Sequence, residues 1–174
     1  GSESENFAEG YAGGQGNLRT LPNPYDFDSD NFLAKIEYQA SEAHRLKLIG
    51  EYFRSKSHVD LLTLEGPTYN GFFNYSDYTG DDVFERKHIG FTHEWDAETA
   101  LFDSLSWTVD WQKSDAEEET RNTTAAFGYG RRLIDYRHGE EDFQLSAQFD
   151  KEAGAHHLTY GFIYQHAEQE NVTD

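Results

Sequence analysis

The chain of 174 residues contains no cysteine. A disulfide framework, a thiolate metal site and a cysteine nucleophile are therefore excluded. It also lacks any apolar run near the length of about eighteen residues that a transmembrane helix needs. Basic residues are few, with 14 Lys and Arg against 33 Asp and Glu, which gives a net charge of −19. This charge argues against a nucleic-acid partner, because the phosphates would be repelled.

What the sequence does contain is an alternation of apolar and polar residues in six segments. They are Phe32–Gln39, Arg45–Phe53, His88–Trp95, Leu105–Gln112, Phe143–Asp150 and His157–Gln165. Alternation with a period of two predicts β-strands that hold one face out of water.

Four alternating positions from each segment would share one face of a sheet. These positions are Phe32, Ala34, Ile36, Tyr38, Leu46, Leu48, Gly50, Tyr52, Ile89, Phe91, His93, Trp95, Leu105, Trp107, Val109, Trp111, Phe143, Leu145, Ala147, Phe149, Leu158, Tyr160, Phe162 and Tyr164. None is charged, and only Gly50 and His93 are neither apolar nor aromatic. The opposite face would carry charged residues such as Lys35, Glu37 and Asp110. This division is typical of a transmembrane β-barrel wall, with lipid outside and water inside.

The connections between the segments are alternately short and long, which also favours a membrane barrel. Such barrels join their strands by tight periplasmic turns and long extracellular loops. The prediction is a single partial barrel over 1–174 without a plug domain. It has hairpins at 32–53, 88–112 and 143–165, and external loops at 1–31, 54–87, 113–142 and 166–174. Six strands are fewer than the eight with which bacterial single-chain barrels start, so a segment of a larger barrel is expected.

Aromatic residues at the segment ends predict two girdles at the membrane interfaces. Beside the short turns we expect Tyr38, Trp95, Trp107, Phe149 and Tyr160. The second girdle would consist of Tyr52, Trp111, Phe143 and Tyr164.

Several stretches resemble the mid-barrel of TonB-dependent outer-membrane receptors, in particular the haem and haemoglobin receptor branch. The similarity lies in Arg19–Pro24, Phe32–Tyr38, His44–Leu48 with Glu51, Tyr136–His138, Phe143–Asp150 and His156–Gly161. It implies an all-β, antiparallel up-and-down barrel in the bacterial outer membrane that imports haem or iron. Outer-membrane lipid, a haem-carrying protein and TonB, reached through the absent plug domain, would be its partners, with haem as cargo. The branch's Phe-Arg-Ala-Pro box is missing, so no ligand residue is carried over from the family.

Two sets of residues in the long connections are candidates for recognition. An aromatic set, Tyr69, Phe72, Phe73, Tyr75 and Tyr78, has the composition of a protein-contact surface, or else folds back onto the barrel rim. His58 and His138 lie where an imidazole could reach a haem iron, although a loop histidine is more often simply solvated.

Two other classes of protein stay open. One is a soluble or lipid-anchored small β-barrel binding module, in which the apolar face would be inside. The other is an outer-membrane barrel enzyme. No nucleophile elbow, phosphate loop or zincin motif is present, so a protein without catalytic residues is predicted. The acidic clusters do not form a complete calcium-binding pattern, so no metal site is expected.

Overall fold

A computed structural model describes residues 3–5, 16, 19–67, 74–125 and 129–173. Nearly all of them form β-strands. The elements are β1 (Glu3–Glu5), β2 (Tyr25–Gln39), β3 (His44–Asp60), the short 3₁₀ helix η1 (Leu62–Leu64), β4 (Gly66–Pro67), β5 (Asn74–Asp96), β6 (Ser104–Ala125), β7 (Tyr129–Ala153) and β8 (His156–Thr173). No helix within these residues is long and apolar enough to cross a membrane.

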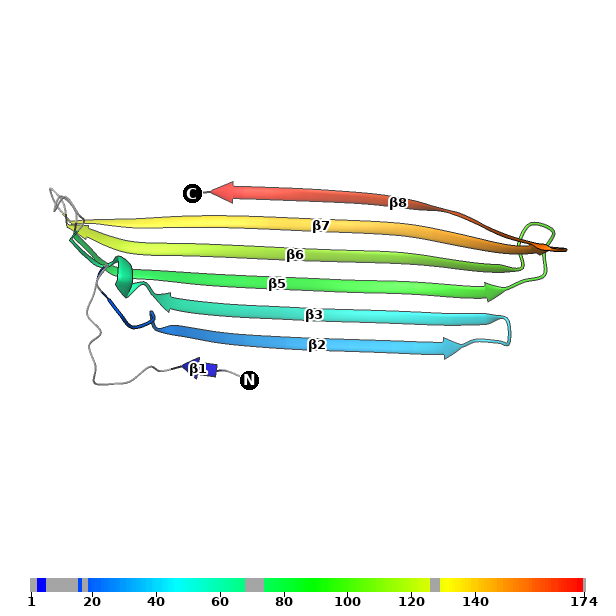
Figure 1. The fold of residues 1–174 in the computed structure, drawn as a ribbon, viewed down its shortest axis with the longest axis horizontal. Helices are drawn as coiled ribbons and strands as arrows, with labels where there is room; N and C mark the ends of the chain where they lie inside the picture. Colours follow the sequence, from blue (N-terminus) through cyan, green and yellow to red (C-terminus); the bar gives the residue numbers. More distant parts are fainter. Residues whose placement is uncertain (1–2, 6–15, 17–18, 68–73, 126–128, 174) are drawn as a thin grey trace.

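The strands form one antiparallel sheet in the order β1-β2-β3-β5-β6-β7-β8, with β4 paired to β5 (Figure 1). Each long strand pairs with the next long strand along the chain. The all-β, up-and-down architecture predicted from the sequence is therefore confirmed. All six alternating segments lie inside the six long strands.

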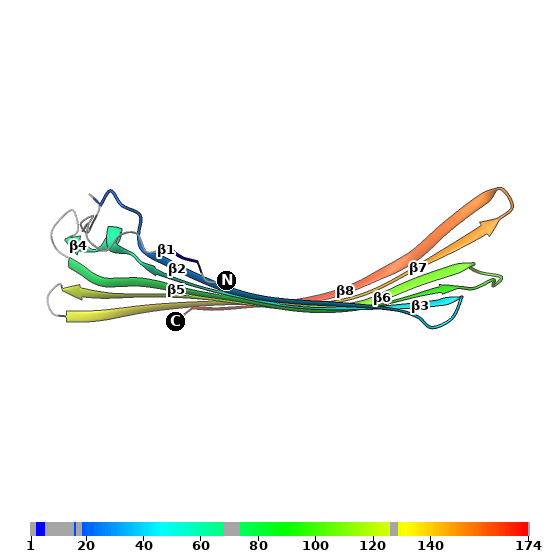
Figure 2. The same ribbon diagram turned by 90° about the horizontal axis from the view of Figure 1, so that it is seen from below.

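The sheet is a single layer that bends and twists along its length (Figure 2). Among the residues whose side chains are described, no hydrophobic one is buried. Phe32, Ile36 and Ile163 are 65%, 59% and 72% exposed. The described chain therefore has no core of its own, and its apolar side chains need a partner phase or a partner layer.

The strand register places all 24 predicted positions on one face. Residues directly opposite each other in antiparallel strands share a face. One such row crosses the whole sheet through Ile36, Leu48, Phe91, Val109, Leu145 and Tyr164. We call these 24 residues the apolar band, their side of the sheet the band face, and the other side the reverse face.

The long strands continue far beyond the segments that alternate, so the loop assignments need correction. Most of 54–87 and 113–142 is strand, because β3 ends at Asp60, β5 begins at Asn74, and only 126–128 separates β6 from β7. Similarly, β2 begins at Tyr25 within 1–31 and β8 reaches Thr173 within 166–174. The alternation ends earlier because charged side chains replace apolar ones on the band face, while the strands continue to pair.

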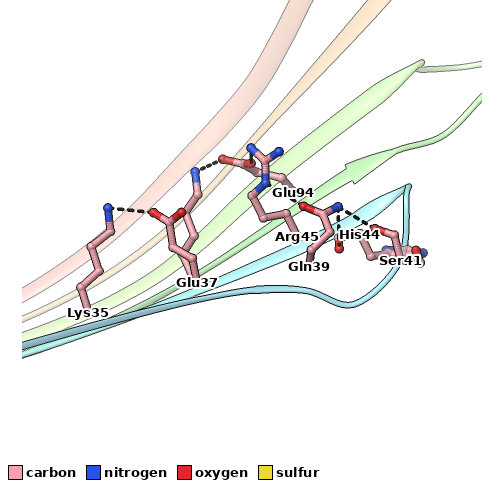
Figure 3. Close-up of polar contacts among 8 residues, drawn as sticks. Lys35, Glu37, Gln39, Ser41, His44, Arg45 and Glu94 are labelled. Atoms are coloured by element: carbon pink, nitrogen blue, oxygen red, sulfur yellow. Dashed lines mark hydrogen bonds and ion pairs between the residues drawn. The ribbon is translucent and has the colours of Figure 1, made fainter.

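The reverse face is polar where it backs the apolar band. Lys35 pairs with Glu37 at 2.8 Å, and Glu94 accepts from Lys47 and, at 3.3 Å, from Arg45. Figure 3 shows Lys35, Glu37, Arg45 and Glu94 on one side of the sheet, the side toward which the β7–β8 hairpin bends. The concave side therefore carries the charges, and the apolar band lies on the convex side.

We predict that Gly161 is required for the β7–β8 pairing. A Cβ at Gly161 would collide with the backbone carbonyl oxygen of Ala147 on the neighbouring strand, whereas a Cβ at Gly50 meets nothing within 4 Å. Overpacking of this kind costs about 1–3 kcal/mol. Gly161→Ala in the full-length protein should lower the temperature at which the barrel unfolds in SDS, as seen by gel mobility. The control Gly50→Ala should leave that temperature unchanged, and equal behaviour of the two variants would contradict the pairing.

Candidate functional site: the strand extensions

The strands are longer than a membrane requires. A transmembrane β-strand needs about 9–11 residues, while β5, β6 and β7 have 23, 22 and 25. At about 3.3 Å per residue, β7 spans roughly 80 Å. The parts beyond the apolar band, on the side away from the short turns, are here called the strand extensions. They comprise residues 25–31, 53–60, 74–88, 112–125, 129–142 and 165–173.

Where the extensions begin, the band face changes from apolar to charged and the reverse face becomes richer in aromatic residues. On the band face, apolar side chains give way to charged ones, in rows that the register joins across the sheet. These residues include Asp26, Asp28, Asp30, Arg54, Lys56, Asp81, Glu85, Asp115, Glu117, Glu119, Asp135, Arg137 and Glu170. A charged face of this kind belongs in water rather than in lipid.

On the reverse face of the extensions, aromatic rings replace many of the charges. Tyr25 and Phe27 stack with ring centroids 6.4 Å apart, and Phe53 and Phe84 approach to 6.0 Å. Tyr136 occupies the same face further along the sheet. Tyr25, Phe27, Phe84 and Tyr136 are each more than a third exposed. Sequence reasoning missed this aromatic surface because the alternation was read only within the apolar band.

A β-bulge brings two of the predicted recognition residues together. Ser76 pairs with Thr123 but Thr79 pairs with Arg121, so the register shifts between them, and Asp77 has φ of 49°. The extra residue puts Tyr75 and Tyr78 on the reverse face, with their rings 6.0 Å apart and nearly perpendicular. The backbone of Tyr78 is held by Glu65 Oε1, which accepts from its N–H at 3.0 Å. Of the other predicted aromatics, Tyr69, Phe72 and Phe73 lie outside the described residues.

His58 lies on the band face, on β3 rather than in a loop. Its Nδ1 is 2.6 Å from Asp81 Oδ1 and its Nε2 is 3.4 Å from Asp60. The hydrogen bond to Asp81 raises the pKa of His58 above its usual 6.5, with a further contribution from Asp60. Both ring nitrogens thus have carboxylate partners, which leaves neither of them free for a haem iron.

His138 lies on the reverse face of β7, so it cannot act together with His58 from one side. Asn171 Oδ1 lies 2.7 Å from His138 Nδ1 and also accepts a hydrogen bond from the Tyr136 hydroxyl at 3.1 Å. An amide oxygen only accepts, so His138 Nδ1 carries a proton, and in the neutral ring Nε2 is the nitrogen with the lone pair. This arrangement is the one by which a second contact prepares a histidine to bind a metal. No sequence pattern selects Asn171 as a partner of His138, because its role depends on the β7–β8 register.

Within the part of the chain that the structure describes, no three His, Asp or Glu residues are grouped as a metal site would require. Any metal bound there by His138 would therefore have to bring its other ligands with it, as the iron of a haem does.

Comparison with known proteins points in one direction. No family model matches the sequence. "Hemoglobin and hemoglobin-haptoglobin-binding protein A" of Haemophilus influenzae is 35% identical over 121 residues, which cover 65% of this chain and 11% of that protein. "Hemoglobin-haptoglobin-binding protein A" of the same organism is 31% identical over 103 residues, which cover 57% of this chain and 10% of that protein. The chain thus spans about a tenth of the length of the curated relatives it matches, and both are named as binding proteins rather than enzymes.

The raised pKa of His58 generates a prediction on pH. A folded-state pKa above the unfolded value contributes stability that is present below about pH 6.5 and is lost as the pH rises through the folded pKa. In the full-length protein, NMR titration of the histidine rings should show His58 titrating above 6.5. Asp81→Asn should lower its pKa more than Asp60→Asn does, because the Asp81 hydrogen bond is the larger cause. Equal effects of the two substitutions would contradict the assigned geometry.

Proposed function

We propose that this chain is part of the barrel wall of a TonB-dependent outer-membrane receptor that imports haem or iron. The strand extensions and the connections between them would recognise a haem-carrying protein outside the cell. This proposal rests on the change from apolar to charged residues along one face of the sheet. The convex side is apolar over the apolar band, which suits lipid, and charged in the strand extensions, which suits water.

The curvature of the sheet supports a membrane barrel over a soluble one. A soluble barrel encloses its apolar side chains and exposes its charges. Here the ion pairs of Lys35, Glu37, Arg45 and Glu94 lie on the concave side, as in a water-filled lumen (Figure 3). Only a lipid phase covers a convex apolar band without a further protein layer.

The open edges of the sheet support a place within a larger barrel. No pairing among the described residues joins β8 to β1 or β2. Unpaired backbone groups in lipid cost several kcal/mol each, so both edges need strand partners. The two Haemophilus proteins, about ten times as long as the matched region, have room for such strands.

Recognition belongs to the strand extensions because they are the part that stands beyond the bilayer. The short turns 40–43 and 154–155 would then face the periplasm. Two surfaces are proposed for contact outside: the acidic band face, and the ring pair Tyr75 and Tyr78, which Tyr69, Phe72 and Phe73 precede in the sequence. The names of the relatives point to haemoglobin as the carrier. An acidic receptor surface favours a basic patch on that carrier and an association rate that falls with salt.

The first test concerns the ring pair. Tyr75→Ala with Tyr78→Ala in the full-length receptor should weaken haemoglobin binding at least tenfold, since an aromatic anchor at the centre of an interface contributes about 2 kcal/mol or more. Surface plasmon resonance at two salt concentrations measures affinity and association rate together. The control is Leu101→Ala, an exposed apolar residue at the opposite end of the sheet, which should bind normally. Unchanged binding in the double variant, with the barrel assembled, would remove these rings from the recognition surface.

The second test concerns His138 as a ligand of haem iron. Haem added to the full-length receptor should give a Soret band that shifts in His138→Ala but not in His58→Ala, because only His138 has a free Nε2. Asn171→Leu should weaken haem binding less than His138→Ala does. It removes the acceptor that holds the proton on His138 Nδ1, but it leaves the imidazole ring in place. A Soret band that does not respond to His138→Ala would show that the iron is held elsewhere.

A further inference from the structure

A chain of hydrogen bonds crosses the band face beside the short turns, where no function has yet been assigned. Trp107 Nε1 donates to His93 Nδ1 at 2.9 Å, and His93 Nε2 lies 3.0 Å from His44 Nδ1. The two imidazoles are also stacked, with centroids 5.2 Å apart. His44 is the first residue of β3 and lies on the band face, opposite Trp95.

The chemistry of the three rings determines which atom donates in each of these hydrogen bonds. An indole N–H only donates, so His93 Nδ1 must accept and its proton must sit on Nε2. His93 then donates to His44 Nδ1, which must in turn be the unprotonated nitrogen of a neutral ring. The reverse arrangement would leave His93 without any proton. The proton of His44 is therefore on Nε2, the ring nitrogen that does not face His93.

His44 Nε2–H has no acceptor among the described residues. Every polar contact of this ring is made through Nδ1. A donor in such a place needs an acceptor from outside the chain or it loses the energy of a hydrogen bond. Tyr38 lies diagonal to His44 across the hairpin and is 62% exposed. Its hydroxyl is a second hydrogen-bond donor on the same face.

The surroundings indicate what kind of acceptor would fit beside His44. His44 opens a row of rings across the sheet: His44 to Trp95 at 5.6 Å, Trp95 to Phe102 at 5.6 Å, Phe102 to Phe149 at 5.4 Å and Phe149 to Tyr160 at 5.1 Å. This row contains Trp95, Phe149 and Tyr160 of the girdle predicted from the sequence, while Tyr38 and Trp107 lie one row nearer the band centre. Aromatic rows of this kind settle at the level of lipid headgroups.

We propose that His44 Nε2–H, oriented by His93 and Trp107, binds the phosphate of a phospholipid in the periplasmic leaflet. The inference rests on the membrane placement in the proposed function but not on haemoglobin binding. Phosphate oxygens accept hydrogen bonds strongly and lie at the height of the aromatic row, directly beside the apolar band that receives the acyl chains. The site would fix the depth and the rotation of this wall in the outer membrane.

Solid-state NMR tests the contact directly. The full-length receptor, labelled with ¹⁵N-histidine, is reconstituted into vesicles of phosphatidylethanolamine and phosphatidylglycerol. One protonated Nε2 signal should be dephased by lipid ³¹P, and His44→Phe should abolish that dephasing while keeping a ring in the aromatic row. His93→Phe should reduce it, since His44 then loses its fixed tautomer. The control His166→Phe removes a band-face histidine that contacts Glu168 at 3.1 Å, and should leave the signal intact.

Native mass spectrometry of the detergent-extracted protein adds a second measurement: His44→Phe should retain one phospholipid fewer than the wild type. Haemoglobin binding and resistance to SDS are measured on the same preparations. A receptor that inserts and binds haemoglobin but shows no dephasing overturns this inference alone, because water then fills the place of phosphate. Dephasing that persists in His44→Phe overturns it as well. Failure of the wild type to insert into vesicles overturns the proposed function.

Discussion

The proposed placement depends on one constraint: every backbone N–H and C=O of a strand that crosses a membrane must find its partner within the sheet. Lipid offers no hydrogen bonds, so a spanning strand must be paired along its whole length. The ladders from β2 to β8 meet this requirement without interruption across the apolar band, and the register shift recorded in the long ladders falls at Ser76–Thr79, well outside it. In the part of the chain that the structure describes, irregular backbone lies outside the apolar band.

Because the ladder is continuous, the side chains alone decide which medium each part of the sheet meets. Over the apolar band the convex side is apolar and the concave side charged. In the strand extensions Asp, Glu, Lys and Arg occupy the convex side, and rings such as Phe53 and Phe84 occupy the concave side. In the proposed placement, one backbone arrangement thereby passes from lipid to water with no change of fold. The register of the extensions then places Tyr75, Tyr78 and His138 on the reverse face.

This also explains how far the sequence could be interpreted. Where apolar and polar residues alternate strictly, the six segments, their order and the 24 positions of one face followed from the pattern of residues. Beyond the band the alternation is lost although the strands continue, so 54–87 and 113–142 were taken for loops. His58 and His138 could be named as candidates, but not assigned to opposite faces. Asp81 and Asn171, which decide what each imidazole can bind, lie 23 and 33 residues away and are brought in by the ladders.

The same dependence on register separates the histidines by function. All are imidazoles on paired strands, yet their hydrogen-bond partners differ in what they can accept or donate. Carboxylates on both sides of His58 favour its charged form and make it part of the acidic surface. The amide oxygen beside His138 places a proton on Nδ1, so that Nε2 is the nitrogen that can meet a metal. The indole of Trp107 donates to His93 Nδ1, so His93 donates from Nε2 to His44. The remaining N–H of His44 is then suited to bind an anion. A neighbouring strand supplies the deciding group in each case, so the register of the barrel sets the chemistry of its surface.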